Sequence, residues 1–253
     1  MNPQESNSIK YVPAIPLLGV FPRNQTLRWT GMDSELLFKK HCQDPDKKRI
    51  LDDQGFLTPD CITYSYNHQG FRCDEFDDRP AGVALGCSFT KGVGIPLNNT
   101  WPTVLSELLG QHIWNLGAGG GALDTCFRVL DYYIDILNVK FVILCSPHHW
   151  RFEFFDKNDK PRTFISGHLD HEKYRDFAEE WMTSDLNINT NAQRNILAMK
   201  WRCQEKNIPF FELKNNDNLQ KDGLGRDLAH PGIEANKKFA HLCYEKIKNA
   251  KQL

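Results

Sequence analysis

The sequence predicts an α/β fold with a central parallel sheet and helices on both of its faces. From residue 81 onward, short apolar runs alternate with segments whose apolar residues recur at spacings of three and four. Such runs are typical of buried strands, and such spacings are typical of amphipathic helices. Because strands that alternate with helices pair in parallel, the alternation favours a parallel sheet covered on both sides.

Each predicted element has its own local signal. Pro102 suits the first turn of a helix and Gly110 suits its end, whereas Phe-Val-Ile-Leu-Cys at 141–145 has the unbroken apolar character of a strand buried on both faces. The segment Thr190-Asn191-Ala192-Gln193 resembles a capping box and predicts that a helix begins there. We therefore expect strands at 82–85, 113–116, 141–145 and 208–213, and helices at 102–109, 123–137, 190–206 and 231–248.

Residues 1–80 differ in composition from the rest and are rich in Pro, Asn, Gln and Asp. We expect them to form an N-terminal extension packed on a core domain at 81–253, because they are too polar for a core of their own. Their aromatic residues still need burial. Within the extension, 61–66 is extended and 44–53 is a solvated helix or loop. Residues 147–187 are interpreted as irregular.

The overall charge excludes some classes of partner. The 253 residues include 31 Lys and Arg and 32 Asp and Glu, so the chain has no excess of positive charge of the kind that binds nucleic acid. No segment approaches the roughly 20 apolar residues of a membrane span. Residues 1–10 are polar, so we expect no secretory signal. The predicted partners therefore include neither nucleic acid nor a membrane.

The eight cysteines form no C-x-x-C pair, and several lie in apolar stretches, as Cys145 does. Buried free thiols explain this pattern better than a disulfide framework does. Free thiols persist in a reducing compartment. We therefore expect a cytoplasmic protein.

Four groups of chemically capable residues fall at the same edge of the predicted sheet. Ser88, Gly120, His148 and the loop from Asp227 to His230 all follow strands or precede helices on that side. In open parallel sheets, ligands bind at the carboxyl ends of the strands. The coincidence indicates a functional site at this edge.

Ser88 and the pair Asp227 and His230 contain the parts of a catalytic triad. Ser88 follows a strand, with Gly86 two positions before it. A serine hydroxyl becomes a good nucleophile only when a base takes its proton and a third group orients that base. An aspartate three residues before a histidine can bond one imidazole nitrogen and leave the other for the serine. The alternatives are that Ser88 only caps a helix and that Asp227 is a solvated residue near a helix start.

The glycine run at 117–121 has two interpretations. It follows a strand and precedes a helix, as a phosphate-binding loop would. However, it lacks the G-x-G-x-x-G spacing, and no acidic residue ends the next strand. The alternative is that a glycine N–H in this run faces an oxyanion.

A metal site is a further alternative. The sequence gathers His148, His149, His168, Asp170, His171 and Glu172 in one region. Their spacings fit no helical ligand pair such as i, i+4. We therefore expect a polar loop there, with no metal and no cofactor.

Three motifs together resemble the SGNH (GDSL-type) hydrolase superfamily. They are G-C-S-F-T at 86–90, N-L-G-A-G-G at 115–120 and D-L-A-H-P-G at 227–232, and the resemblance covers about 81–248. It implies a flavodoxin-like three-layer α/β/α sandwich and acyl-ester hydrolysis without a metal. It places the nucleophile on Ser88, the acid and base on Asp227 and His230, and oxyanion N–H donors on Ser88 and Gly120. The stretch 67–72 resembles the lead-in of members that have an N-terminal extension.

One block departs from the family pattern. The family has G-x-N-D after its third strand, and the asparagine donates to the oxyanion. Here the strand runs into Cys-Ser-Pro-His-His-Trp-Arg at 145–151, without an asparagine. His148 lies nearest to the position, and His149 and Arg151 are alternatives. Loss of one such donor typically costs about 10²–10³ in rate.

The sequence thus predicts a serine esterase that cleaves an acyl ester through an acyl-enzyme. We expect a small-molecule or carbohydrate ester as its substrate, with an O-acetyl group on a carbohydrate as the leading candidate. Two other functions fit the same motifs. One is a non-catalytic protein that binds a carbohydrate or a partner, since fold does not fix function. The other is an acyltransferase that uses the same triad.

Overall fold

The computed structural model describes residues 22–158, 161–165, 175–214 and 222–250. In these residues the central sheet has four parallel strands in the order β4-β3-β5-β8. The strands are β3 (Ala81–Leu85), β4 (Ile113–Asn115), β5 (Val139–Ser146) and β8 (Phe210–Lys214). The predicted α/β fold with a parallel sheet is confirmed, and each predicted strand lies within a few residues of its observed position.

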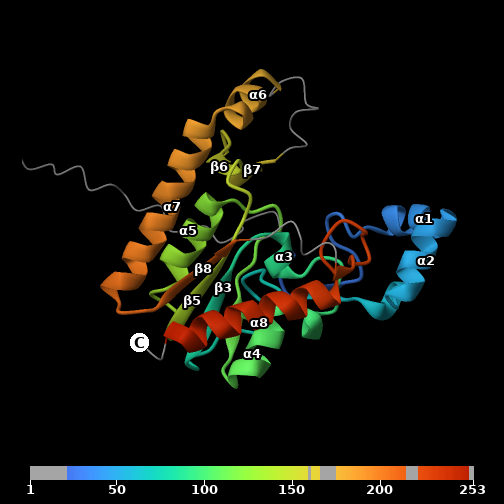
Figure 1. Ribbon diagram of the computed structural model, residues 1–253, viewed down its shortest axis with the longest axis horizontal. Coiled ribbons are helices and arrows are strands. Elements are labelled where there is room, and N and C mark those ends of the chain that lie inside the picture. Colours follow the sequence, from blue (N-terminus) through green and yellow to red (C-terminus); the bar gives the residue numbers. More distant parts are fainter. Residues whose placement is uncertain (1–21, 159–160, 166–174, 215–221, 251–253) are drawn as a thin grey trace, which may run out of the picture.

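Helices cover both faces of this sheet and make three layers (Figure 1). The alternation of side chains along β5 divides the core, because successive residues of a strand point to opposite faces. The covering helices are α4 (Trp101–Leu109), α5 (Leu123–Tyr133), α7 (Asp185–Glu205) and α8 (Ile233–Ala250). Val142 and Leu144 lie in the cluster with α5 and α7, whereas Ile143 and Cys145 lie in the cluster with α4 and α8.

Helix α7 begins earlier than the sequence predicts. Its N-cap is Ser184, whose hydroxyl accepts a hydrogen bond from the Asn187 N–H at 3.3 Å. The predicted capping box at 190–193 lies inside the helix, so that prediction is wrong. Asn191 is buried there, and its amide donates to Asp124 Oδ2 on α5 at 3.1 Å. A residue of a capping-box sequence can instead lie within a helix and contact a neighbouring helix. The sequence does not show this, because the contact depends on α5.

The interpretation of 147–187 as irregular is also wrong. The segment contains the antiparallel hairpin β6 (Phe152–Phe155) and β7 (Pro161–Phe164), followed by α6 (Arg175–Thr183). These elements project beyond the sheet at the top of Figure 1. Glu153 fixes the hairpin to α5 by accepting hydrogen bonds from Arg128 Nε at 2.6 Å and Thr125 Oγ1 at 2.9 Å. The strands are too short to give a clear alternating pattern.

The described part of the N-terminal segment lies at one end of the sheet, at the right of Figure 1. Its elements are β1 (Gln25–Leu27), α1 (Glu35–Gln43), α2 (Pro45–Asp53), the 3₁₀ turn η1 (Pro59–Cys61) and β2 (Tyr64–Tyr66). Strands β1 and β2 pair antiparallel. A buried cluster joins Phe38, Leu51 and Tyr64 of this segment to Ile95, and Leu228 packs against it. Phe71 lies in the cluster under α5.

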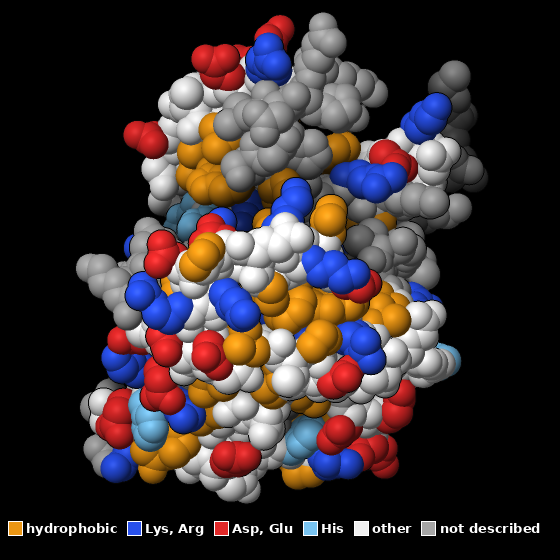
Figure 2. Space-filling model, turned by 90° about the vertical axis from the view of Figure 1, so that its right-hand side faces the viewer, with side chains coloured by type: hydrophobic (Ala, Val, Ile, Leu, Met, Phe, Trp, Pro, Cys, Tyr) orange, Lys and Arg blue, Asp and Glu red, His pale blue; other side chains and the backbone are white. Residues whose placement is uncertain are grey.

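The surface, the helices and the thiols give three further observations. Lys and Arg side chains are interspersed with Asp and Glu on the face seen in Figure 2. Among the described residues, no helix combines the length and the apolar character that a bilayer span requires. All eight cysteines are free, and five of them are buried.

Candidate active site

Ser88 begins the short helix α3 (Ser88–Lys91) directly after β3. The chain turns sharply at Gly86, where a Cβ atom would lie 2.1 Å from Thr90 Oγ1 and 2.9 Å from the Cys145 carbonyl oxygen. Only glycine fits so close to the next strand. Since the first N–H groups of a helix have no acceptor within it, the turn leaves the Ser88 N–H available at the sheet edge.

The loop between β8 and α8 brings Asp227 and His230 to Ser88. The Ser88 hydroxyl lies 2.7 Å from His230 Nε2, and His230 Nδ1 is hydrogen-bonded to Asp227 Oδ2. Asp227 is buried, and its Oδ1 accepts the N–H groups of Ala229 at 3.2 Å and of His230 at 3.1 Å. The three residues predicted for the triad therefore form one continuous hydrogen-bonded chain.

The carboxyl of Asp227 is held in its ionised form. Burial on its own would raise its pKa, but the hydrogen bond and the charge of His230, with the two backbone N–H groups, lower the pKa below its usual value. A carboxylate that accepts a hydrogen bond from Nδ1 fixes the proton of neutral His230 on that nitrogen. Nε2 is then the acceptor for the Ser88 proton.

Gly120 lies in the loop that follows β4, and this loop packs against α3. The Ala118 N–H donates to the Gly86 carbonyl at 2.9 Å. A Cβ atom at Gly117 would lie 2.4 Å from the Lys91 nitrogen, so the two backbones approach closely. Gly120 has φ of +74°, a conformation that favours glycine. The loop is thereby held beside the turn that carries Ser88.

Asn115 is a residue that sequence reasoning missed. It is buried at the end of β4, where its amide donates to the Thr90 carbonyl at 2.8 Å and accepts the Gly117 N–H at 3.0 Å. It therefore joins α3 to the loop of Gly120. The sequence did contain a signal for this role, because Asn115 is a polar residue at the end of an apolar strand and is the first residue of the motif at 115–120.

The segment after β5 places His148 at the same sheet edge but turns it toward Trp150. His148 is exposed, and its ring stacks on Trp150 with centroids 5.8 Å apart. His149 is half-buried with Nε2 3.3 Å from Ser146 Oγ, and burial, followed by the charge of Lys214, lowers its pKa. A small cavity of about 150 Å³ lies between these residues and Lys214.

Four residues of the possible metal site, His168, Asp170, His171 and Glu172, lie outside the described residues. Within the described ranges, no group of three His, Cys, Asp or Glu side chains is arranged to hold a metal ion.

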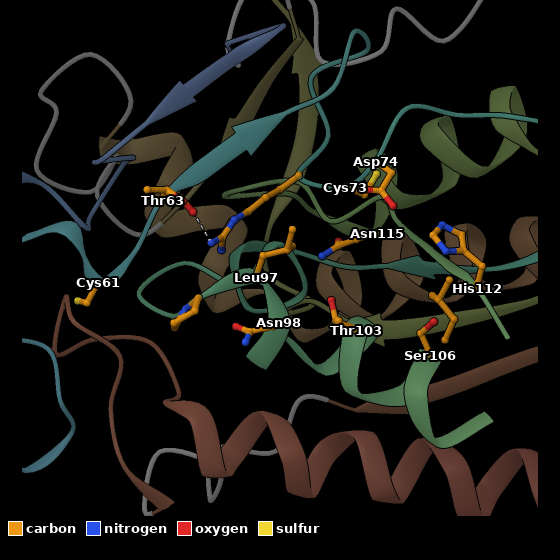
Figure 3. A pocket seen from close by; sticks show the side chains of 13 residues that line it. Cys61, Thr63, Cys73, Asp74, Leu97, Asn98, Thr103, Ser106, His112 and Asn115 are labelled. Atoms are coloured by element: carbon orange, nitrogen blue, oxygen red, sulfur yellow. Dashed lines mark hydrogen bonds between the residues drawn. The ribbon is translucent and has the colours of Figure 1, made fainter. Parts of the chain in front are cut away.

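A second cavity, of about 520 Å³, lies away from the triad. Figure 3 shows Thr103 and His112 on its lining, with Leu97 and Asn115. It opens between α4, β4 and the N-terminal segment. Its size is within the usual range of ligand pockets, but neither Ser88 nor His230 lines it. The triad therefore lies outside this cavity.

Comparison with known proteins gives matches among solved structures alone. No family model matches the chain, and no curated protein matches it. Three solved structures that resemble this chain are esterases. The acetyl xylan esterase Est2A from the rumen bacterium Butyrivibrio proteoclasticus has a TM-score of 0.41 and 13% identity, covering 72% of this chain and 66% of its own.

In the other two, the match covers more of their own chains. The psychrotrophic esterase EstA from Pseudoalteromonas has a TM-score of 0.38 and 12% identity, covering 70% of this chain and 100% of its own. AlinE4, an SGNH-hydrolase family esterase, has a TM-score of 0.35 and 16% identity, covering 68% and 75%. With TM-scores this low, the likeness does not by itself assign an activity to this chain.

Proposed function

We propose that this protein is a serine esterase that hydrolyses acyl esters through an acyl-enzyme. One observation carries the proposal, namely the unbroken hydrogen-bonded chain from Ser88 through His230 to Asp227. The three side chains come from two loops at the carboxyl ends of β3 and β8, where parallel sheets place their sites. A helix cap or a solvated aspartate would not require this alignment.

The chemistry follows from the positions of the protons. Ser88 Oγ attacks the ester carbonyl carbon while His230 Nε2 takes the hydroxyl proton. The tetrahedral intermediate collapses as His230 returns that proton to the leaving alcohol, which leaves an acyl group on Ser88. A water molecule then attacks the acyl-enzyme while His230 takes one of its protons. The bond to Ser88 Oγ breaks as His230 gives that proton to the serine oxygen, and the carboxylic acid departs. Asp227 keeps His230 oriented and stabilises its charged form.

The oxyanion of each intermediate needs hydrogen-bond donors. We assign this role to the backbone N–H groups of Ser88 and Gly120, with His148 as the side-chain donor in place of the asparagine. Preorganised donors of this kind act where the negative charge develops. As substrate we propose an O-acetyl ester of a carbohydrate. Acetyl xylan, which the name of Est2A gives as the substrate of that protein, is an ester of this class.

The decisive experiment labels the nucleophile. A fluorophosphonate should modify the wild-type protein at Ser88, and Ser88→Ala should neither be labelled nor hydrolyse p-nitrophenyl acetate above the background rate. Ser106→Ala is the control, because this hydroxyl lies on α4 and donates to the Gln111 carbonyl. If Ser88→Ala keeps more than a few per cent of the wild-type kcat, the nucleophile is another residue.

A further inference from the structure

A buried ion pair connects the N-terminal segment to the loop that carries Asp227. Arg226 donates from Nε to Asp33 Oδ1 at 2.9 Å and from Nη2 to Asp33 Oδ2 at 2.7 Å. Their side chains are 0% and 1% exposed. Removing two charges from water costs several kcal/mol for each ion, so such a pair is retained only with near-complete hydrogen bonding. Arg226 meets this requirement with further bonds to the carbonyls of Pro59 at 2.6 Å and Arg28 at 2.7 Å.

The ion pair belongs to a closed ring of hydrogen bonds. The Tyr64 hydroxyl donates to Asp33 Oδ2 and accepts the Gly94 N–H at 2.9 Å. The Arg226 N–H donates to the Gly94 carbonyl at 2.8 Å, which closes the ring. Burial, followed by the charge of Asp33, raises the pKa of Tyr64, so its hydroxyl keeps the proton that it donates. We call Asp33, Tyr64, Gly94 and Arg226 the Asp33 ring.

The Asp33 ring is linked both to Asp227 and to the element that carries Ser88. On one side, Arg226 is covalently joined to Asp227, and a Cβ atom at Gly94 would lie 2.9 Å from Asp227 Oδ1. On the other side, Gly94 follows Val93, whose N–H donates to the Ser88 carbonyl at 3.1 Å. The ring therefore spans the distance between the element of Ser88 and the loop of Asp227.

The loop of Asp227 needs such support. Leu228, directly after Asp227, has φ of +52°, which is unfavourable for a residue with a branched side chain. Strained residues of this kind persist only when surrounding contacts hold them. Leu228 packs against the buried cluster of the N-terminal segment. Contacts from outside the loop thus hold it in the conformation that aligns His230.

We propose that the Asp33 ring is a positioning device for the triad, so that the N-terminal segment completes the active site. The inference rests on the proposed function, because it concerns the alignment of Ser88 with its base. The ring contributes no atom to the reaction. It fixes Asp227, and through it His230, relative to Ser88, and a misplacement of about 1 Å in such a site can cost about 10²-fold in rate.

The test removes one hydroxyl from the ring. Tyr64→Phe in the full chain breaks two hydrogen bonds but leaves the ion pair of Asp33 and Arg226 in place. We expect kcat for p-nitrophenyl acetate to fall about tenfold with less than about a twofold change in KM, since only the transition state needs the exact alignment. The rate of fluorophosphonate labelling at Ser88 should fall in parallel. Circular dichroism at the assay temperature gives the folded fraction to which each kcat is referred.

Two controls separate positioning from a general loss of stability. Tyr66→Phe removes a neighbouring hydroxyl on the same strand, which bonds Thr30 Oγ1 at 3.0 Å and is not part of the ring. Its kcat should stay within about twofold of wild type. For the ion pair itself, Asp33→Asn is compared with Asp131→Asn, whose partner is Arg202 between α5 and α7. Asp33→Asn should lower kcat per folded molecule, and Asp131→Asn should not.

The outcomes distinguish the two proposals. If the wild type is neither active nor labelled at Ser88, the proposed esterase function fails. If the wild type is active and Tyr64→Phe matches Tyr66→Phe in kcat and in labelling rate, the positioning role is overturned. A loss of stability in Tyr64→Phe with an unchanged kcat per folded molecule also overturns it.

Discussion

Lys91 lies three residues after Ser88 and is 3% exposed. Its Nζ atom lies 3.4 Å from Thr30 Oγ1 and 4.9 Å from the centre of the Tyr66 ring. Burial, followed by the positive charge of Arg72, lowers its pKa to about 7. In the unfolded chain a lysine keeps its ordinary pKa of about 10.4. Between these two values the unfolded state binds more protons, so stability should rise with pH across this window.

Lys91→Met should therefore stabilise the protein more at pH 7 than at higher pH. Each pKa unit corresponds to about 1.4 kcal/mol, so the gain in the free energy of unfolding at pH 7 should be on the order of a few kcal/mol. The gain should shrink as the pH approaches 10, where the unfolded lysine also loses its proton. Urea unfolding at pH 7, 8 and 9 measures this.

The control for Lys91→Met is Lys140→Met, at an exposed position on β5. It should change stability little and equally at each pH. An effect of Lys91→Met that is the same at pH 7 and pH 9 would contradict the depressed pKa of Lys91.

At the scale of elements, the segment after β5 distinguishes this chain from the family pattern. Strand β5 ends at Ser146, and the following residues carry His148 and His149 instead of an asparagine. His148 stacks on Trp150 and is exposed. For His148 to act as the oxyanion donor, a ring N–H has to come within hydrogen-bond distance in the complex with substrate, since catalytic hydrogen bonds are often long in the apo state and tighten on binding.

His148→Ala should lower kcat about tenfold or more with little change in KM, because a donor to the oxyanion acts mainly in the transition state. The loss should be smaller than that of Ser88→Ala. Steady-state kinetics on p-nitrophenyl acetate measures both constants. His241→Ala, at an exposed position on α8, is the matched control. A rise in KM alone would instead assign His148 to substrate binding.

At the scale of the whole molecule, the sheet domain and the N-terminal segment share buried surface. Phe71 lies in the core under α5, and Ile95 and Leu228 pack with residues of the segment. Arg72 is also buried, and its guanidinium donates to the carbonyls of Thr63 at 2.7 Å and of Ile95 at 3.0 Å. On these contacts we propose that the described part of the extension, 22–80, packs on the core.

A fragment of residues 81–253 should accordingly fail to fold stably. It would leave Arg226 without Asp33 and without the carbonyls of Pro59 and Arg28 that hold its guanidinium, so the loop of Asp227 would lose these contacts. It would also expose the apolar side chains of Ile95 and Leu228 to water. Expression of the fragment, followed by circular dichroism and an ester assay, measures this. A soluble, active 81–253 fragment would refute the prediction and would also argue against the Asp33 ring.

The sequence by itself predicted those features that have a local signal. Apolar runs predicted β3 and β5, because a strand that is buried on both faces has apolar side chains at consecutive positions. A glycine before a serine and an aspartate before a histidine picked out Ser88, Asp227 and His230. The resemblance to SGNH hydrolases came from the same motifs.

Elements without a strong local signal were predicted less well. The hairpin β6–β7 has strands of four residues, too short for an alternating pattern to stand out. Ser184 and Thr190 both suit an N-cap, and the packing of Asn191 against α5 decided between them. In each case a neighbouring element made the choice.

Tertiary structure alone decided how distant residues meet. Ser88 and His230 are 142 positions apart, and Asp33 and Arg226 are 193 positions apart. No spacing rule links such pairs, because the parallel sheet brings the ends of its strands together whatever the length of chain between them. The three residues proposed for the triad were thus readable in the sequence. Their alignment, and the buried ring proposed to maintain it, depend on the folded chain, because desolvated charges and hydroxyls find partners only after the core has formed.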